Sequence, residues 1–352
     1  DTLQKSGSAA FATARAGPAD RAGSRNDGAA SKGRPSEPTG GDSVFQITSL
    51  ISKASSAPAL ISVLDQVLMR TSTVEPRTVA NIFWSTAALR VGLPPMKRLI
   101  PPMLEMVNFC AAAFNQQELA IILWSCAAMQ SPRSQLEIVL PILAEMVVDK
   151  ADSMMPQQIS NIIWATAKLH RDAPELVAIM PVMAESAIEA AGGLESQHLC
   201  NVIWSTAQLQ KDAPALLEVL PLLAMAAQSE ALFDGLKTRE LATMCWGLAV
   251  CNFSDQNLMK KVASRVALVT PDLSDRSAIF DLAQIACSFA RFGMRHGKMM
   301  AAIASRVSPL TNQLQAWHLC ALAWSYDASD ARGDFADLRG PLGAEVVRRG
   351  SP

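Results

Sequence analysis

The feature that most constrains this chain is a short phrase, clearest at Val79–Leu89, that returns again and again with a tryptophan near its centre. The first four clear copies are centred 40 residues apart. A fixed period of about 20–50 residues is the signature of units that stack on their neighbours instead of sharing one spherical core. The phrase therefore predicts a repeat array. Its copies are centred on Trp84, Trp124, Trp164, Trp204, Trp246, Trp324 and, with cysteine in the tryptophan place, Cys287.

The composition favours helices as the elements of each unit. Half of the 352 residues are hydrophobic and only 5% are aromatic. Alanine, leucine, methionine and isoleucine therefore carry the apolar content, which favours helix over strand. Each unit contains a first helix around the phrase and a second helix that follows a loop. The sequence predicts an all-α fold, an α-solenoid of about seven two-helix repeats of roughly 40 residues.

The sequence divides into a tail, a cap and the array. Residues 1–43 are rich in Gly, Ser, Ala, Pro and Arg, so we expect a disordered tail, either a transit-peptide remnant or plain low-complexity sequence. Residues 44–75 predict a capping helical pair, Val44–Ala54 and Ala59–Arg70, because terminal repeats are atypical. Residues 76–350 form the array. Since the first residue is aspartate, we expect the true N-terminus to lie upstream.

A proline marks the second helix of five units. A proline inside a helix removes one backbone hydrogen bond and kinks the helix. The alternative is that each second helix begins at its proline. Because preceding segments such as Glu175–Met180 favour helix, we expect the kink. The prolines, each 17 residues after a tryptophan, are Pro101, Pro141, Pro181, Pro221 and Pro341.

Positions counted from the tryptophan separate the faces of the first helix. Offsets −5, −2, +3 and +5 are apolar or alanine in nearly every unit and share one broad face at helical spacing, so we expect them to form the core. The tryptophan lies at the edge of this face. We therefore predict that it packs between repeats and does not stack on nucleic-acid bases.

A second set of offsets, −7, −3, +1 and +4, forms a stripe with four cations and no acid. Asn and Gln suit base edges, Arg suits bases and phosphates, and helical repeats can read one base per unit. The stripe predicts an RNA-binding surface. Its candidate residues are Arg77, Asn81, Ser85, Gln117, Gln157, Asn161, Lys168, Gln197, Asn201, Gln208, Arg239, Thr243, Gln284 and Arg291.

Two other interpretations of the stripe stay open. A solvated helix face also avoids large apolar groups, although it would usually carry acids, and here the acids Glu118, Glu240 and Asp281 lie beside the stripe. The array could also be a protein-interaction scaffold of the HEAT or armadillo type, or a structural subunit of a large assembly.

The sequence gives little support to catalytic or metal chemistry. A net charge of −1 argues against coating nucleic acid by bulk charge, but leaves room for a local basic track. His198 and Cys200, like His318 and Cys320, are two residues apart on predicted helices and so face different sides. No glycine-rich phosphate loop and no apolar run of membrane-spanning length occurs. We expect no enzyme activity, no cofactor, no metal and no membrane span.

The phrase also supports a family resemblance. Phe114–Ser125 and Met155–Leu169 resemble the first helix of octotricopeptide repeats, and of the related heptatricopeptide, RAP-associated repeats in FAST-kinase-like proteins. The resemblance covers about residues 76–350. It implies an α-solenoid that binds single-stranded or ribosomal RNA, among other proteins of a ribonucleoprotein complex. It further implies a role in RNA stability, processing, translation or ribosome assembly in a mitochondrion, with a plastid as the alternative.

Overall fold

The computed structural model describes residues 51, 56–68, 74–89, 93–273, 276–329, 340, 342–345 and 347–348. Every regular element within these residues is an α-helix or a 3-10 helix. The prediction of an all-α fold is confirmed.

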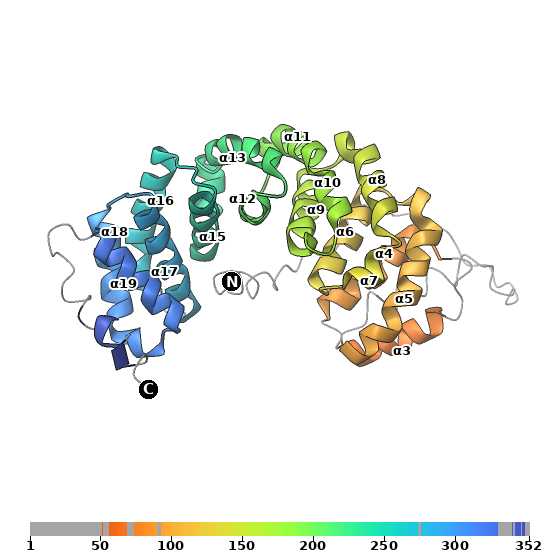
Figure 1. Cartoon of the computed structure of the whole chain (residues 1–352), viewed down its shortest axis with the longest axis horizontal. Coiled ribbons are helices and arrows are strands. Elements are labelled where there is room, and N and C mark those ends of the chain that lie inside the picture. Colours follow the sequence, from red (N-terminus) through yellow and green to blue (C-terminus); the bar gives the residue numbers. More distant parts are fainter. Residues whose placement is uncertain are drawn as a thin grey trace, which may run out of the picture.

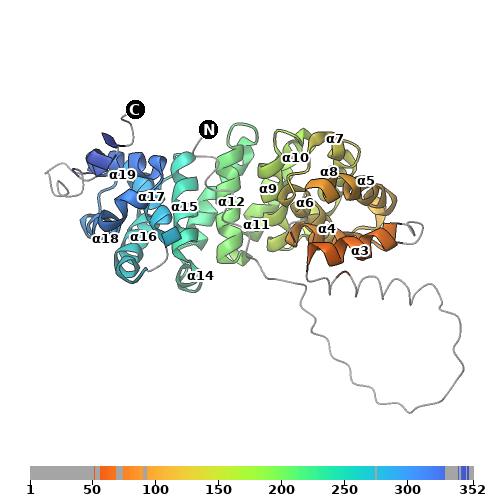
Figure 2. The same cartoon turned by 90° about the horizontal axis from the view of Figure 1, so that it is seen from below.

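The first helices of the seven units pack against one another in chain order. Figure 2, which looks into the molecule from below, shows α17, α15, α12 and α9 side by side in one row. These first helices are α4 (Pro76–Ala88), α6 (Gln116–Ala128), α9 (Pro156–Leu169), α12 (Ser196–Leu209), α15 (Thr238–Val250), α17 (Arg276–Arg291) and α19 (Ala316–Ser329).

The second helices form an outer layer, and the two layers together make an arch (Figure 1). In the middle of the arch α9, α12 and α15 lie inside, and α11, α13 and α16 lie outside. The second-helix elements are α5 (Leu93–Cys110), α7 (Arg133–Leu136), α8 (Leu140–Lys150), α10 (Pro174–Ala178), α11 (Met180–Ala190), η6 (Pro214–Val219), α13 (Leu220–Ala226), α16 (Gln256–Val269) and α18 (Gly297–Val307).

Shorter elements complete the chain. At the N-terminal end α3 (Ala57–Leu68) packs on α4 and α5, close to the second helix predicted for the cap. Apart from Ile51, the first predicted cap helix lies outside the described residues, as do the tail and Pro341. The remaining elements are η3 (Ala111–Ala113), η4 (Ala151–Ser153), η5 (Ala191–Gly193), α14 (Glu230–Gly235), η7 (Thr270–Asp272) and η8 (Ser308–Gln313).

The prolines of the second helices mostly mark helix starts. Pro141, Pro181 and Pro221 each occupy the first turn of a helix, and a separate short helix precedes each one. The expected kink was therefore wrong for these three units. A proline in the first turn costs no helical hydrogen bond, because its missing N–H would have had no partner there. Only α5 runs through its prolines, Pro101 and Pro102, among the second helices described.

The predicted core face of the first helices is confirmed at offsets −5 and −2, whereas offset +5 is buried only at Leu169 and Leu209. The residues at offsets −5 and −2 are buried in all seven units, and the alanine at +3 is buried in the four central ones. Behind them, leucine, methionine and valine of the second helices, such as Leu143, Met183 and Leu223, are also buried. One continuous hydrophobic core therefore runs along the arch between its two layers.

Consecutive first helices approach closely at offset +1, which serine, alanine or glycine occupies in every unit. Gly247 shows how near the neighbouring helix lies. A Cβ atom there would lie 2.7 Å from Ile203 Cγ2 and 3.0 Å from the Ile203 carbonyl oxygen. The carbonyl belongs to the α12 backbone and cannot rotate away, so α12 and α15 depend on a residue without a side chain.

We therefore expect Gly247→Ala to destabilise the array. Overpacking costs about 1–3 kcal/mol, which exceeds or offsets the gain of about 1 kcal/mol that alanine brings to a helix. The net loss should appear as a lower midpoint in urea unfolding. Gly192→Ala is the matched control, since nothing lies within 4 Å of its Cβ position. An unchanged or higher midpoint for Gly247→Ala would contradict the close approach.

An aromatic sandwich joins the last two described first helices. The ring of His318 on α19 stacks on Phe280 of α17, with 4.0 Å between ring centroids, and contacts Trp317 at 3.5 Å. Neither ring nitrogen of this buried histidine has a hydrogen-bond partner among the described residues. Burial therefore lowers the pKa of His318 from 6.5 to about 4.

This histidine should make the fold sensitive to mild acid. Because its folded pKa is depressed, its stabilising contribution is present above pH 6.5 and is lost as the pH falls toward 4. Between pH 7 and pH 5 we expect His318→Phe to lose about 2 kcal/mol less unfolding free energy than the wild type. Urea titrations at both pH values measure this difference. Identical pH dependence of the two proteins would show that His318 does not titrate as described.

Candidate nucleic-acid interface

The structure distributes the fourteen predicted RNA-binding residues over three environments. Five are exposed: Arg77, Gln117, Gln157, Arg239 and Arg291. Seven are partly exposed: Asn81, Asn161, Lys168, Gln197, Gln208, Thr243 and Gln284. Two are buried: Ser85 and Asn201.

Offset +1 lies between neighbouring helices and not on an open surface. Ser85 is only 4% exposed, and Ser125 and Ser288 donate hydrogen bonds to carbonyl oxygens of their own helices, at 2.7 and 2.8 Å. Placing Ser85 on an accessible stripe was therefore wrong. The physical reason is that only a small side chain fits where two first helices meet.

The tryptophan position takes the place of +1 on the open side of the helix. Trp84, Trp124 and Trp246 are partly exposed, and Trp324 is 49% exposed, whereas Trp164 and Trp204 are buried. Offsets −7, −3, 0 and +4 follow one another at steps of four, three and four residues, which keeps them on one line along a helix. This side faces the inside of the arch, since other helices cover the remaining sides (Figures 1 and 2). We call these four offsets the inner face.

The inner face contains no aspartate or glutamate in any of the seven units. Two of the neighbouring acids are bound at helix starts. Glu118 accepts a hydrogen bond from the backbone N–H of Asn115 at 2.9 Å, and Glu240 accepts one from Lys237 at 2.8 Å. These carboxylates cap α6 and α15. Their place beside the stripe therefore has a structural cause.

Tryptophans contact one another across the repeats in the middle of the inner face. The rings of Trp124 and Trp164 stack with 6.2 Å between centroids. Between the third and fourth units, the ammonium of Lys168 lies 5.9 Å from the Trp164 ring centroid and 5.6 Å from the Trp204 ring centroid. The prediction that tryptophans pack between repeats is confirmed for these residues. Sequence reasoning missed that Trp124, like Trp84 and Trp246, also borders the open face.

Lys168 differs from the other predicted cations because it is held between two rings. Burial beside these rings lowers the pKa of its ammonium group, since the charged form loses water. Arg77 and Arg239, by contrast, are exposed and form no ion pair within the described part of the chain. The cations available to a ligand on the inner face are thus chiefly arginines.

Some polar residues of the stripe connect repeats. The Gln284 amide donates to the Ala242 carbonyl of the preceding first helix at 3.3 Å. Asn201 is buried, and its side-chain oxygen accepts no hydrogen bond from described residues. Asn161 and Gln208 remain partly exposed. The accessible polar groups of the inner face therefore lie mainly toward the two ends of each first helix, at −7 and +4.

The described residues show neither a metal-binding cluster nor a membrane-spanning helix. No group of three or more His, Cys, Asp or Glu side chains there could hold a metal ion. None of the described helices has both the length and the apolar character needed to cross a membrane.

Fold and surface together define a helical repeat protein with an open, acid-free inner face. Residues 53–327, well over half of the sequence, match the family described as RNA-editing substrate-binding complex 6 protein. The chain belongs to this family and is thus an RNA-associated helical protein. No individual curated protein matches the sequence.

Lys168, which lies between the rings of Trp164 and Trp204, should stabilise the fold. Lys168→Met keeps the apolar stem but removes the charge, and we expect it to lower the unfolding free energy by about 0.5–2 kcal/mol, the range of a cation–π contact. Gln208→Met changes the corresponding position of the next unit and should cost less. Urea titration measures both. If Lys168→Met proved as stable as the wild type, the two ring contacts would contribute nothing.

Proposed function

We propose that this chain is a non-catalytic, RNA-binding subunit of a ribonucleoprotein complex, and that single-stranded RNA lies along the inner face. The observation that carries this proposal is the acid-free line of offsets −7, −3, 0 and +4 through seven units. Membership of a family named for an RNA-editing substrate-binding complex supports it. The chain would act by holding and positioning RNA.

The inner face offers the two kinds of contact that single-stranded RNA uses. Exposed arginines at −7 and +4, such as Arg77, Arg239 and Arg291, suit phosphate oxygens through paired N–H groups. Partly exposed rings such as Trp84 and Trp246 can stack on bases, an interaction that tolerates every base. Amides such as Gln117 and Gln157 can add hydrogen bonds to base edges.

Partner proteins are part of the proposal because the family name refers to a complex. Large apolar side chains are exposed on three second-helix segments of the outer layer, at Phe109, Ile138 and Met225. Protein interfaces cover side chains of this kind. We propose that the outer layer meets other subunits while the inner face holds RNA.

The finer assignments rest on the recurring tryptophan phrase. We propose that these repeats belong with the octotricopeptide and FAST-kinase-like repeats, and that the protein works in a mitochondrion, with a plastid as the alternative. Its role there would be in RNA stability, processing, translation or ribosome assembly. The similarity of Phe114–Ser125 and Met155–Leu169 to those first helices supports this placement.

Removing the inner-face arginines should weaken RNA binding. We expect the triple variant Arg77→Ala/Arg239→Ala/Arg291→Ala to bind a random single-stranded RNA pool at least tenfold more weakly, because three phosphate contacts are lost. Each lost contact should also reduce the slope of log affinity against log salt concentration by about 0.7. Filter retention at several salt concentrations measures both quantities.

The matched control replaces the same three arginines by lysine, which keeps the charges and should keep most of the salt slope. Equal salt slopes for the alanine variant and the wild type would show that RNA does not bind the inner face. A wild type that retains no RNA from the pool would contradict the function itself and favour the protein-interaction scaffold.

A further inference from the structure

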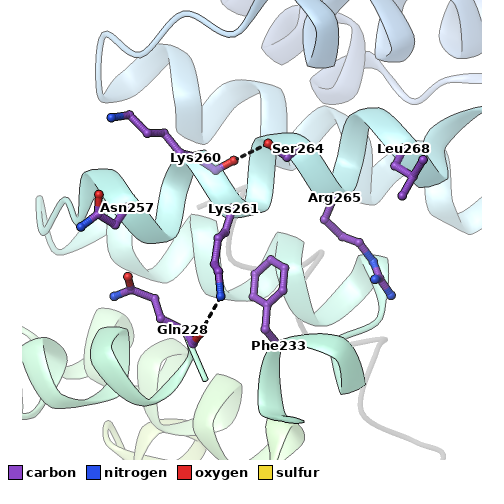
Figure 3. A pocket seen from close by; sticks show the side chains of 8 residues that line it. All are labelled: Gln228, Phe233, Asn257, Lys260, Lys261, Ser264, Arg265 and Leu268. Atoms are coloured by element: carbon purple, nitrogen blue, oxygen red, sulfur yellow. Dashed lines mark hydrogen bonds between the residues drawn. The ribbon is translucent and has the colours of Figure 1, made fainter. Parts of the chain in front are cut away.

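A second surface outside the inner face carries cations in a built groove. Figure 3 shows it between α16 and the segment that contains α14. Its volume is about 570 Å³. The residues that line it are Gln228, Phe233, Asn257, Lys260, Lys261, Ser264, Arg265 and Leu268. This lining contains three cations and no acid.

The charge of α16 sets it apart from earlier second helices. Between Gln256 and Val269 it carries no aspartate or glutamate. The corresponding α8 and α11 carry acids, including Glu145 and Glu185, that are exposed on the outer layer. The neighbouring α18 again has no acid and adds Lys298 and Arg306. α16 and α18 therefore hold five cations and no acid between them, whereas α8 and α11 each carry a net negative charge.

Contacts within the groove hold its cations in place. The Phe233 ring lies between the side chains of Lys261 and Arg265 (Figure 3), with the Lys261 ammonium 5.3 Å from its centroid. Lys261 also donates to the Gln228 carbonyl at 2.7 Å, and Arg265 lies 3.7 Å from the Asp234 carboxylate. Phe233 is itself buried. The ring thus positions two cations and is not open to a stacking base.

Two cations of the groove remain available to a ligand, Lys260 and also Arg265, which meets Asp234 only at 3.7 Å, beyond hydrogen-bond distance. Lys260 is exposed, and among the described residues it has no ion-pair partner. Asn257 and Ser264, also exposed, flank it on the same side of α16. The Ser264 hydroxyl donates to the Lys260 carbonyl at 3.0 Å (Figure 3), so the cations and the Asn257 amide are the donors that this open groove offers to anionic oxygens.

We infer that this groove binds the phosphodiester backbone of RNA, as a second contact beyond the inner face. The inference rests on the proposed function, since it assumes that the chain binds RNA. An acidic peptide would bring apolar side chains, and Leu268 is the single exposed apolar residue of the lining. RNA phosphates need only the cations and donors that the groove supplies.

The position of the groove fits an RNA that continues from the inner face. α14 ends at Gly235, three residues before α15 begins at Thr238, so the groove lies near the end of α15 that carries exposed Arg239. A strand that leaves the inner face at Arg239 meets the α14–α16 groove next. The groove therefore extends the path around the edge of the arch toward the outer layer.

The test removes the two groove cations that do not hold a backbone carbonyl. We expect Lys260→Ala/Arg265→Ala to bind a random single-stranded RNA pool about tenfold more weakly, with a salt slope reduced by about 1.4 for two lost phosphate contacts. The full chain is used, and circular dichroism melting checks that the variant folds. Lys150→Ala/Arg348→Ala makes the same charge change elsewhere and should keep its affinity within about twofold.

Three results would overturn the inference. The first is an unchanged salt slope for the groove variant while the inner-face alanine variant loses affinity; the proposed function would then stand alone. The second is an equal loss for Lys150→Ala/Arg348→Ala, which would reduce the effect to net charge. The third is intact RNA binding with lost binding of a poly-glutamate peptide, which would assign the groove to an acidic protein segment. A fourth result, a wild type that binds no RNA, would contradict both this inference and the proposed function.

Discussion

The arch depends on one contact, the side-by-side packing of consecutive first helices through small residues. The residue one place after the tryptophan is buried in every unit and is serine, alanine or glycine. A larger side chain there would separate the helices, as the Ile203 atoms around Gly247 show. Because this contact repeats, the first helices form one continuous row. The positions that carry it are Ser85, Ser125, Ala165, Ser205, Gly247, Ser288 and Ser325.

The same packing decides what the inside of the arch can present. With +1 buried, the tryptophan beside it borders the open side and is partly exposed at Trp84, Trp124 and Trp246. In the middle of the row the rings of Trp124 and Trp164 stack, and Lys168 lies between those of Trp164 and Trp204. Polar residues remain accessible mainly near the helix ends, so arginine and glutamine lie on both sides of a central aromatic line. Proteins that bind single-stranded nucleic acid with little sequence preference commonly use aromatic rings flanked by cations.

The fold could be predicted from the sequence, but the orientation of each helix only in part. The period of 40 residues and the buried offsets −5 and −2 predicted the array and its core correctly. Offsets 0 and +1 lie about 100° apart around a helix, and both border the apolar face, so spacing alone could not decide which one opens outward. Because tryptophan is large and apolar, its size suggested that offset 0 lies at the core. The small residue at offset +1 was the better indicator of the buried position. The groove at Lys260 joins segments that no repeat pattern connects.

The central claim, that RNA lies on the inside of the arch, can be tested by mapping where RNA touches the protein. Single-stranded RNA that contains 4-thiouridine would be bound to the full chain and crosslinked with light, and the crosslinked peptides would be identified by mass spectrometry. We expect crosslinks on the first helices, on peptides that contain Trp84, Trp124 or Trp246. Bound RNA that crosslinks to second helices alone would contradict it.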